Sequence, residues 1–204
     1  MAIRVHHLNQ SRSQRIVWLL EELGLPYELV RYQRDAVTRF APPALKAIHP
    51  LGKSPLLEDD GVLIEESGAI VQYLLDRYGK GALQPAAGTP AALRHLQLLH
   101  FAEGSAMLPL LLRIYVARLG DGGAPLQDRI DGEVASHFDY LEGILEPSGY
   151  FIGAGLTGAD IMLSFPVGIA VKQPEGSRWP RLKAYTDALE ARPAWQRALA
   201  ATGG

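Results

Sequence analysis

Cysteine is absent from this chain of 204 residues. Its absence excludes disulfide bonds, a CxxC redox pair, a cysteine nucleophile and any metal site built on thiolates. The six histidines include the adjacent pair His6 and His7, but none stands in an HxxxH or HExxH spacing. We therefore expect no metal ion in this protein.

A strong charge and a long apolar run are also missing. The formal net charge is -2, so no basic field would attract nucleic acid or an anionic membrane. The most apolar stretch, residues 161–171, is interrupted by Ser164, Pro166 and Gly168 and falls short of transmembrane length. Residues 1–7 contain no apolar signal-peptide core. We expect a cytoplasmic protein that binds neither nucleic acid nor membrane.

The first part of the chain alternates strand and helix patterns. Apolar residues recur at period two in the expected strands and at helical spacing between them, and the Asp-Gly step at 60–61 favours a hairpin. The predicted elements are strand 3–8, helix 13–23, strand 27–30, a short helix near 44–48, strands 56–58 and 62–64, and helix 67–78. This β-α-β-α-β-β-α order is that of a thioredoxin-like domain.

Strand signals vanish in the remainder of the chain. Residues 80–90 are rich in glycine, alanine and proline, as a linker is. A long helix over 93–119 should bend or break at Gly104 and Pro109. Further helical stripes follow over 126–145, 160–171, 179–189 and 195–201. We expect an α/β domain over 1–79, a linker over 80–90 and an all-α domain over 91–204.

Two features of segment 49–67 are unusual for a connection. Pro55 stands directly before an apolar strand, where a missing N–H normally weakens pairing. Ser67 stands at the predicted N-cap of a helix. Together they would present free backbone groups and an anion-binding helix start on one surface. Such a surface suits a small peptide-like ligand.

Three motifs follow one another in a specific order. The first is the strand-turn-helix of residues 6–15, leading into Trp18-Leu19-Leu20-Glu21-Glu22. The second is His49-Pro50-Leu51-Gly52-Lys53-Ser54-Pro55, followed by Glu66-Ser67, and the third is Leu156-Thr157-Gly158-Ala159-Asp160-Ile161. Over nearly its whole length the chain resembles a cytosolic glutathione S-transferase, with most likeness to theta-related, serine-type members of fungal and bacterial kinds.

The resemblance implies a glutathione site in the first domain. The peptide bond before Pro55 would be cis, which leaves the backbone N–H and C=O of Ser54 free for the main chain of the ligand. Ser67 and the first helix amides would hold the γ-glutamyl carboxylate, and Glu66 would hold the ammonium group. Lys53 would meet the glycine carboxylate, although an exposed, solvated lysine explains that position almost as well.

Ser11 stands where serine-type members carry their catalytic serine. A free thiol has a pKa of about 8.5, and lowering it by about two units requires about 2.7 kcal/mol. One hydrogen bond to a charged group supplies about 1.5–3 kcal/mol, and a helix N-terminus adds about 0.3–1 kcal/mol. A single hydroxyl at a helix start is therefore sufficient. Ser13 is the competing hydroxyl, Arg12 could also approach the sulfur, and Asn9 stands where tyrosine-type members place their tyrosine.

The second domain offers less specific candidates. The resemblance puts an electrophile pocket between the domains, near the middle of the first long helix, at Met107, Leu108, Leu111 and Tyr115, although the same spacing is also that of a helix core. Glu103 either reaches the γ-glutamyl group bound to a partner subunit or is an interfacial or solvated acid. Thr157 and Asp160 have the spacing of a capping box and a role in folding.

These motifs imply an enzyme rather than a passive domain. We expect a homodimeric glutathione S-transferase of detoxification, which activates glutathione as a thiolate and conjugates it to small apolar electrophiles. Glutathione is the co-substrate, and no cofactor is expected. Two alternatives are a glutathione-dependent peroxidase or isomerase at the same site, and a non-catalytic ligand-binding or protein-interaction module of the same fold.

Overall fold

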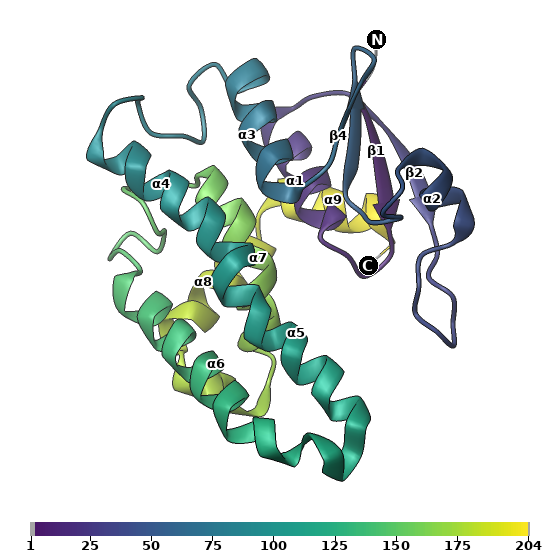
Figure 1. Ribbon diagram of the computed structural model, residues 1–204. Helices are drawn as coiled ribbons and strands as arrows, with labels where there is room; N and C mark the ends of the chain where they lie inside the picture. Colours follow the sequence, from purple (N-terminus) through teal and green to yellow (C-terminus); the bar gives the residue numbers. More distant parts are fainter. Residues whose placement is uncertain (1–2, 204) are drawn as a thin grey trace. The chain divides into compact units, whose positions relative to one another are not determined.

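A computed structural model describes residues 3–203 of the chain (Figure 1). The chain divides into two compact units. The first unit combines the residues up to Ala82 with those from Glu190 onward, and the second comprises Leu83–Leu189. The last segment therefore groups with the first unit instead of with the helices that precede it.

The first unit is built on a sheet of four strands in the order β2-β1-β3-β4. The central strand β1 pairs parallel with β2 and antiparallel with β3, and β3 pairs antiparallel with β4. The strands are β1 (Ile3–Leu8), β2 (Tyr27–Tyr32), β3 (Leu56–Asp59) and β4 (Val62–Ile64), and the helices between and after them are α1 (Ser13–Leu23), α2 (Pro43–Ile48) and α3 (Ser67–Tyr78). This order confirms the predicted thioredoxin-like domain.

Helix α1 has apolar residues on two sides, and each side has a partner. Five successive residues, Ile16 to Leu20, are fully buried, which is too wide a stripe for one contact face. One of these partners is α9 (Pro193–Thr202), which packs along α1. The rings of Trp18 and Trp195 meet edge to face with centroids 4.8 Å apart. Helix α9, expected in the helical domain, therefore completes the core of the first unit.

Strand β1 places its two histidines on opposite faces of the sheet, because successive side chains of a strand alternate. His6 is buried and joins the Tyr32 hydroxyl through Nδ1 at 2.9 Å and the Glu58 carboxylate through Nε2 at 2.8 Å. His7 is also buried and contacts the start of α1 instead. The two neighbours therefore belong to separate hydrogen-bond networks.

The described residues of the second unit contain helices and no strand, as predicted. In chain order these are α4 (Pro90–Phe101), a π-helical turn (Ala102–Ala106), α5 (Met107–Val116), a 3-10 segment (Ala117–Gly123), α6 (Ala124–Ile144), α7 (Gly158–Ala170), a second 3-10 segment (Pro174–Arg178) and α8 (Pro180–Glu190). Across residues 3–203, every helix is too short or too polar to cross a lipid bilayer.

The predicted break in the long helix is confirmed at the π-helical turn. Pro109 has no N–H to donate to the carbonyl four residues earlier, so the regular hydrogen-bond ladder cannot continue there. The helix widens by one residue, and Met107 N–H donates to the carbonyl of Ala102. The turn contains Gly104, the other residue at which a break was predicted.

The start of α7 carries the predicted capping box. The Asp160 carboxylate accepts hydrogen bonds from the N–H and the hydroxyl of Thr157, both at 2.8 Å, and from the N–H of Phe151 at 3.1 Å. Asp160 is completely buried, and this burial raises the pKa of its carboxyl in spite of the three donors. The prediction that these residues shape the fold is confirmed.

Candidate functional site

The candidate site begins where β3 stops pairing with β1. The Ser54–Pro55 peptide bond is cis, and the last antiparallel pair of the two strands joins His6 to Leu56. Because Pro55 has no N–H, the Ser54 side chain replaces the missing ladder bonds. Its Oγ donates to the His6 carbonyl at 2.8 Å and accepts from the Leu8 N–H at 3.2 Å. The preceding Lys53 is exposed.

The start of α1 brings two serine hydroxyls into contact. Ser11 Oγ lies 2.7 Å from Ser13 Oγ and accepts a hydrogen bond from the Ser13 backbone N–H at 3.3 Å. Ser11 Oγ also lies 3.4 Å from Ser54 Oγ. The structure therefore unites the serine motif of α1 with the cis-proline segment, two sequence features more than 40 residues apart.

His7 lies behind these hydroxyls and was missed as a candidate in the sequence. Its Nδ1 is 2.8 Å from Ser13 Oγ. Burial lowers the pKa of His7, the positive charge of Arg31 lowers it further, and a hydrogen bond with the backbone of Thr202 opposes this shift. His7 is therefore a neutral imidazole at neutral pH. Its partners come from α1, β2 and α9, so no local motif could have revealed them.

The start of α3 differs from the prediction in one detail. Ser67 is the first residue of the helix, and the N-cap position belongs to Glu66, whose backbone has a positive φ of 68°. The Ser67 hydroxyl accepts a hydrogen bond from Nη2 of Arg15 at 2.9 Å, and both side chains are buried. The prediction of Ser67 as N-cap is wrong because the positive φ of Glu66 makes that residue the N-cap, so the helix starts one residue earlier than predicted.

Arg15 is a second residue that sequence reasoning overlooked. Its side chain is 1% exposed and places a permanent positive charge beneath the first turn of α3. The charge adds to the positive end of the helix dipole, so this region attracts an anion. The available signal in the sequence was an arginine inside the apolar stripe of a predicted helix.

Asn9 and Arg12 stand on either side of Ser11 along the chain. The side-chain oxygen of Asn9 accepts a hydrogen bond from the backbone N–H of Arg34 at 2.8 Å. The backbone carbonyl of Asn9 accepts one from Arg34 Nε at 3.1 Å. Asn9 therefore holds the segment that follows β2. Arg12 occupies the N-cap position of α1 and makes no side-chain capping hydrogen bond there.

The candidates in the second unit lie on different sides of one helix. In α5, Met107 is buried in the core, Leu111 is half-buried, and Leu108 and Tyr115 are more than half exposed. Glu103 is half-buried in the π-helical turn. Only part of the predicted set therefore offers apolar surface that a substrate could touch.

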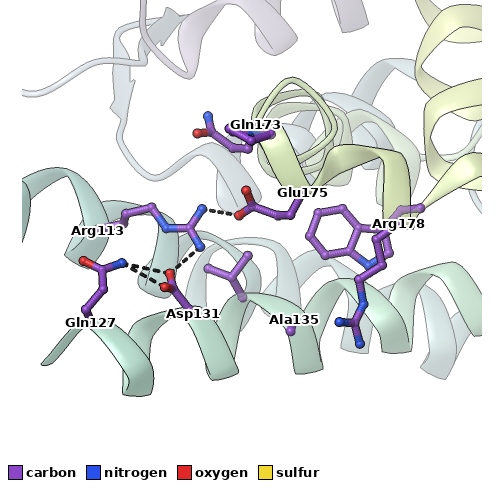
Figure 2. Close-up of a pocket in the computed structure, with 10 residues that line it drawn as sticks. Arg113, Gln127, Asp131, Ala135, Gln173, Glu175 and Arg178 are labelled. Carbon is purple, nitrogen blue, oxygen red and sulfur yellow. Dashed lines mark hydrogen bonds and ion pairs between the residues drawn. The ribbon is translucent and has the colours of Figure 1, made fainter.

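A hollow of about 540 Å³ in the second unit involves other residues (Figure 2). Arg113 lines it and forms ion pairs with Asp131, at 2.8 Å, and with Glu175. Gln127 donates to the same Asp131 carboxylate at 2.9 Å. The charges of Arg113, Asp131 and Glu175 therefore neutralise one another within the hollow. Over residues 3–203 no cluster of histidine and carboxylate side chains is arranged to hold a metal ion.

Comparison with protein families gives two matches in chain order. Residues 3–76 match the N-terminal domain of glutathione S-transferase, and residues 124–188 match the C-terminal domain of the same family. The two matched ranges lie one in each half of the chain and include Ser11, Pro55, Ser67 and the capping box of α7.

Individual relatives extend the likeness to almost the full length. The chain is 36% identical to glutathione S-transferase 1 of Saccharomyces cerevisiae, with 97% of this chain and 96% of the yeast protein covered. A glutathione S-transferase from Actinobacillus pleuropneumoniae is 38% identical and superposes with a TM-score of 0.90 over 99% of this chain and 93% of its own. A glutathione transferase homologue from Lodderomyces elongisporus, solved with two glutathione molecules per subunit, has the same fold at 23% identity, with a TM-score of 0.83 over 98% and 99% of the two chains.

Proposed function

This chain belongs to the glutathione S-transferase family, and from that membership we propose that it binds glutathione at the Ser11–Ser54–Ser67 face of its first unit and conjugates it to small apolar electrophiles. The contact of Ser11 with the cis-proline segment carries this proposal. It brings a hydroxyl at a helix start next to backbone groups that suit a peptide ligand. We further propose that the enzyme is a cytoplasmic homodimer.

The peptide part of glutathione has a matching set of groups. The backbone of Ser54 would pair with the main chain of the ligand, and Lys53 would meet its glycine carboxylate. The γ-glutamyl carboxylate would bind at the first turn of α3, where Ser67, the free amides and the buried Arg15 all favour an anion. The exposed Glu66 would take the γ-glutamyl ammonium group.

Ser11 is the better candidate of the two hydroxyls for binding the sulfur. Ser11 retains an exposed fraction of 6%, whereas Ser13 has none and faces the ring of His7. The reaction requires a donor that stabilises a thiolate, and the protein itself forms no covalent bond. One charge-assisted hydrogen bond and a helix end together reach the roughly 2.7 kcal/mol that lowering a thiol pKa by about two units requires.

The electrophile is proposed to contact the exposed apolar side chains of α5, Leu108 and Tyr115, together with the half-buried Leu111. Met107 supports this helix from the core. Glu103 is proposed as an acid that acts across the dimer on the partner's γ-glutamyl group.

Turnover of a generic aromatic halide with glutathione tests the proposal. For Ser11→Ala we expect kcat/KM near neutral pH to fall about 100-fold, which corresponds to about two units in the thiol pKa, and to recover in alkali where glutathione ionises unaided. Retention on a glutathione resin should persist. Full activity of Ser11→Ala combined with loss in Ser13→Ala would reverse the assignment, and retention without any turnover in wild type would indicate a binding module.

A further inference from the structure

His7 ends a line of hydrogen-bonding atoms that begins at Ser11. Ser11 Oγ lies 2.7 Å from Ser13 Oγ, which lies 2.8 Å from His7 Nδ1. The three side chains have exposed fractions of 6%, 0% and 3% in that order, so bulk water does not interrupt the line. The other acceptor near the Ser13 hydroxyl, the Leu8 carbonyl, is further away at 3.5 Å.

The tautomer of His7 sets the direction of the hydrogen bonds in the line. The backbone of Thr202 also faces the ring and favours its protonated form. Since Nδ1 faces Ser13, the Thr202 backbone lies toward Nε2, and we assign the N–H of the neutral ring to Nε2. In the neutral ring, Nδ1 is then a bare acceptor. Ser13 then donates to His7. Ser11 donates to Ser13, whose oxygen is 2.7 Å away, rather than to Ser54 Oγ at 3.4 Å, so both protons point toward the ring.

A bound thiolate requires the opposite direction. A sulfur anion only accepts, so Ser11 has to donate to it and can then accept from Ser13. Ser13 in turn has to accept from an N–H at Nδ1 of His7. With Nε2 already protonated, this state of the ring is an imidazolium.

We propose that His7 is the positioning residue that receives the proton of the glutathione thiol, acting through Ser13 and Ser11. The inference rests on the proposed role of Ser11 and goes beyond it, because a thiolate-stabilising hydroxyl alone leaves the proton to solvent. His7 touches neither substrate and acts on the sulfur only through the two hydroxyls.

The transfer conserves atoms and charge. The S–H bond breaks, and its proton forms a new O–H bond on Ser11. The proton that Ser11 carried passes to Ser13, and the proton that Ser13 carried forms an N–H bond at Nδ1 of His7. Both hydroxyls end neutral with their directions reversed, and the products are a thiolate and an imidazolium. After the sulfur has reacted, the proton returns along the same atoms and leaves to solvent.

The surroundings of His7 keep it ready to accept. The groups that face the ring are Ser13 from α1, the Thr202 backbone from α9 and Arg31, which pairs with His7 in the β1–β2 register. Arg31 is itself held by the Ala201 carbonyl, at 3.0 Å from Nε and 2.6 Å from Nη2. A cation beside a buried ring disfavours its protonation in the free enzyme. A thiolate at the other end of the line supplies the compensating negative charge.

Proton release on glutathione binding tests the inference. Wild-type enzyme and glutathione are mixed in weakly buffered indicator solution near neutral pH, and the thiolate is followed by its ultraviolet absorbance. S-Methylglutathione has the same other ionisable groups and no thiol, so it supplies the blank. We expect wild type to release less than about half a proton per thiolate, and His7→Leu and Ser13→Ala, which cut the line, to release about one.

His7→Asn separates proton acceptance from hydrogen-bond positioning. Its amide can still bond Ser13 but cannot take up a proton, so release should rise to about one proton per thiolate while the thiol pKa changes less than in His7→Leu. For His7→Leu we expect the thiol pKa to rise by about one unit, a loss of about tenfold in kcat/KM below that pKa. Affinity for S-methylglutathione should stay unchanged in both variants.

His6→Gln is the matched control, because His6 is the adjacent buried histidine and its ring bonds Tyr32 and Glu58 instead. It should release protons as wild type does. Release of about one proton per thiolate by wild type overturns the inference, and this measurement stands even if the His7 variants do not fold. If Ser11→Ala forms as much thiolate as wild type, the proposed role of Ser11 fails instead.

Discussion

The starts of α7 and α1 both carry hydroxyl side chains, and these bond to different kinds of partner. At α7, Thr157 and Asp160 bond each other and the backbone within one turn. At α1, Ser11 and Ser13 bond side chains from the cis-proline segment and from β1. The first arrangement is complete within residues 151–160, the helix turn and the loop before it. The second has partners that can change when a ligand arrives.

This difference separates a folding role from a chemical one. At the start of α7, the Asp160 carboxylate accepts hydrogen bonds from three buried donors. Its loss would leave these donors unsatisfied, which lowers the stability of the whole fold. The serines of α1 contribute less to helix capping, since the N-cap position belongs to Arg12 without a side-chain bond. Variants at the two helix starts should therefore alter different measured quantities.

The largest expected effect is on stability at α7. Asp160→Ala leaves the N–H groups of Phe151 and Thr157 and the Thr157 hydroxyl buried without their acceptor. We expect the free energy of unfolding to fall by about 3 kcal/mol in chemical denaturation. The exposed acid Asp187 serves as control, and Asp187→Ala should unfold as wild type does. Equal stability of both variants would contradict the distinction between the two helix starts.

The next effect is on ligand affinity at α3. Arg15→Met removes the buried charge under Ser67 but keeps much of the volume. We expect the Kd for glutathione to rise about tenfold, or about 1.4 kcal/mol, while kcat at saturation stays near wild type. Ser67→Ala should weaken binding in the same way, and the double variant should lose less than the sum, since the two groups act as a pair. If the losses of affinity in the two single variants add up in the double variant, Arg15 and Ser67 act independently.

A single hydroxyl at each start gives the closest comparison. Thr157→Ala should lower the free energy of unfolding by about 1 kcal/mol, the usual cost of losing a capping hydroxyl, with unchanged thiol pKa in the glutathione complex. Ser11→Ala should change unfolding by less than about 0.5 kcal/mol and raise that thiol pKa. Calorimetry and the pH profile of turnover distinguish them, and a stability loss at Ser11 equal to that at Thr157 would remove the contrast.

The smallest expected effect is the pH dependence of stability that comes from His7. Its pKa is lowered in the folded state, chiefly by burial, so below the ordinary histidine pKa of about 6.5 the unfolded chain binds more protons. Stability should therefore fall as the pH drops through that value. His7→Leu should lose less stability than wild type over the same interval in denaturant titrations. An identical pH slope for both proteins would show that His7 is not held neutral.

Patterns within a few residues could be read from the sequence, and long-range contacts could not. The capping box, the hairpin and the break before Pro109 follow from spacing inside one or two turns. The hydroxyl line could not be predicted, because His7, Ser13 and Thr202 meet only after three elements have packed. The N-cap prediction for Ser67 was wrong because the positive φ of Glu66 leaves no clear trace in residue type.

The packing of α9 on α1 makes the first unit discontinuous along the chain. A ribosome therefore delivers all of Leu83–Leu189 before Ala201, which holds Arg31, and Thr202, which faces His7. During synthesis the first unit lacks helix α9, and the His7 ring lacks its Thr202 contact. Folding of this unit must close a loop of the entire helical unit, a slow, long-range step. The edge-to-face pair of Trp18 and Trp195 provides a fluorescent reporter of that closure.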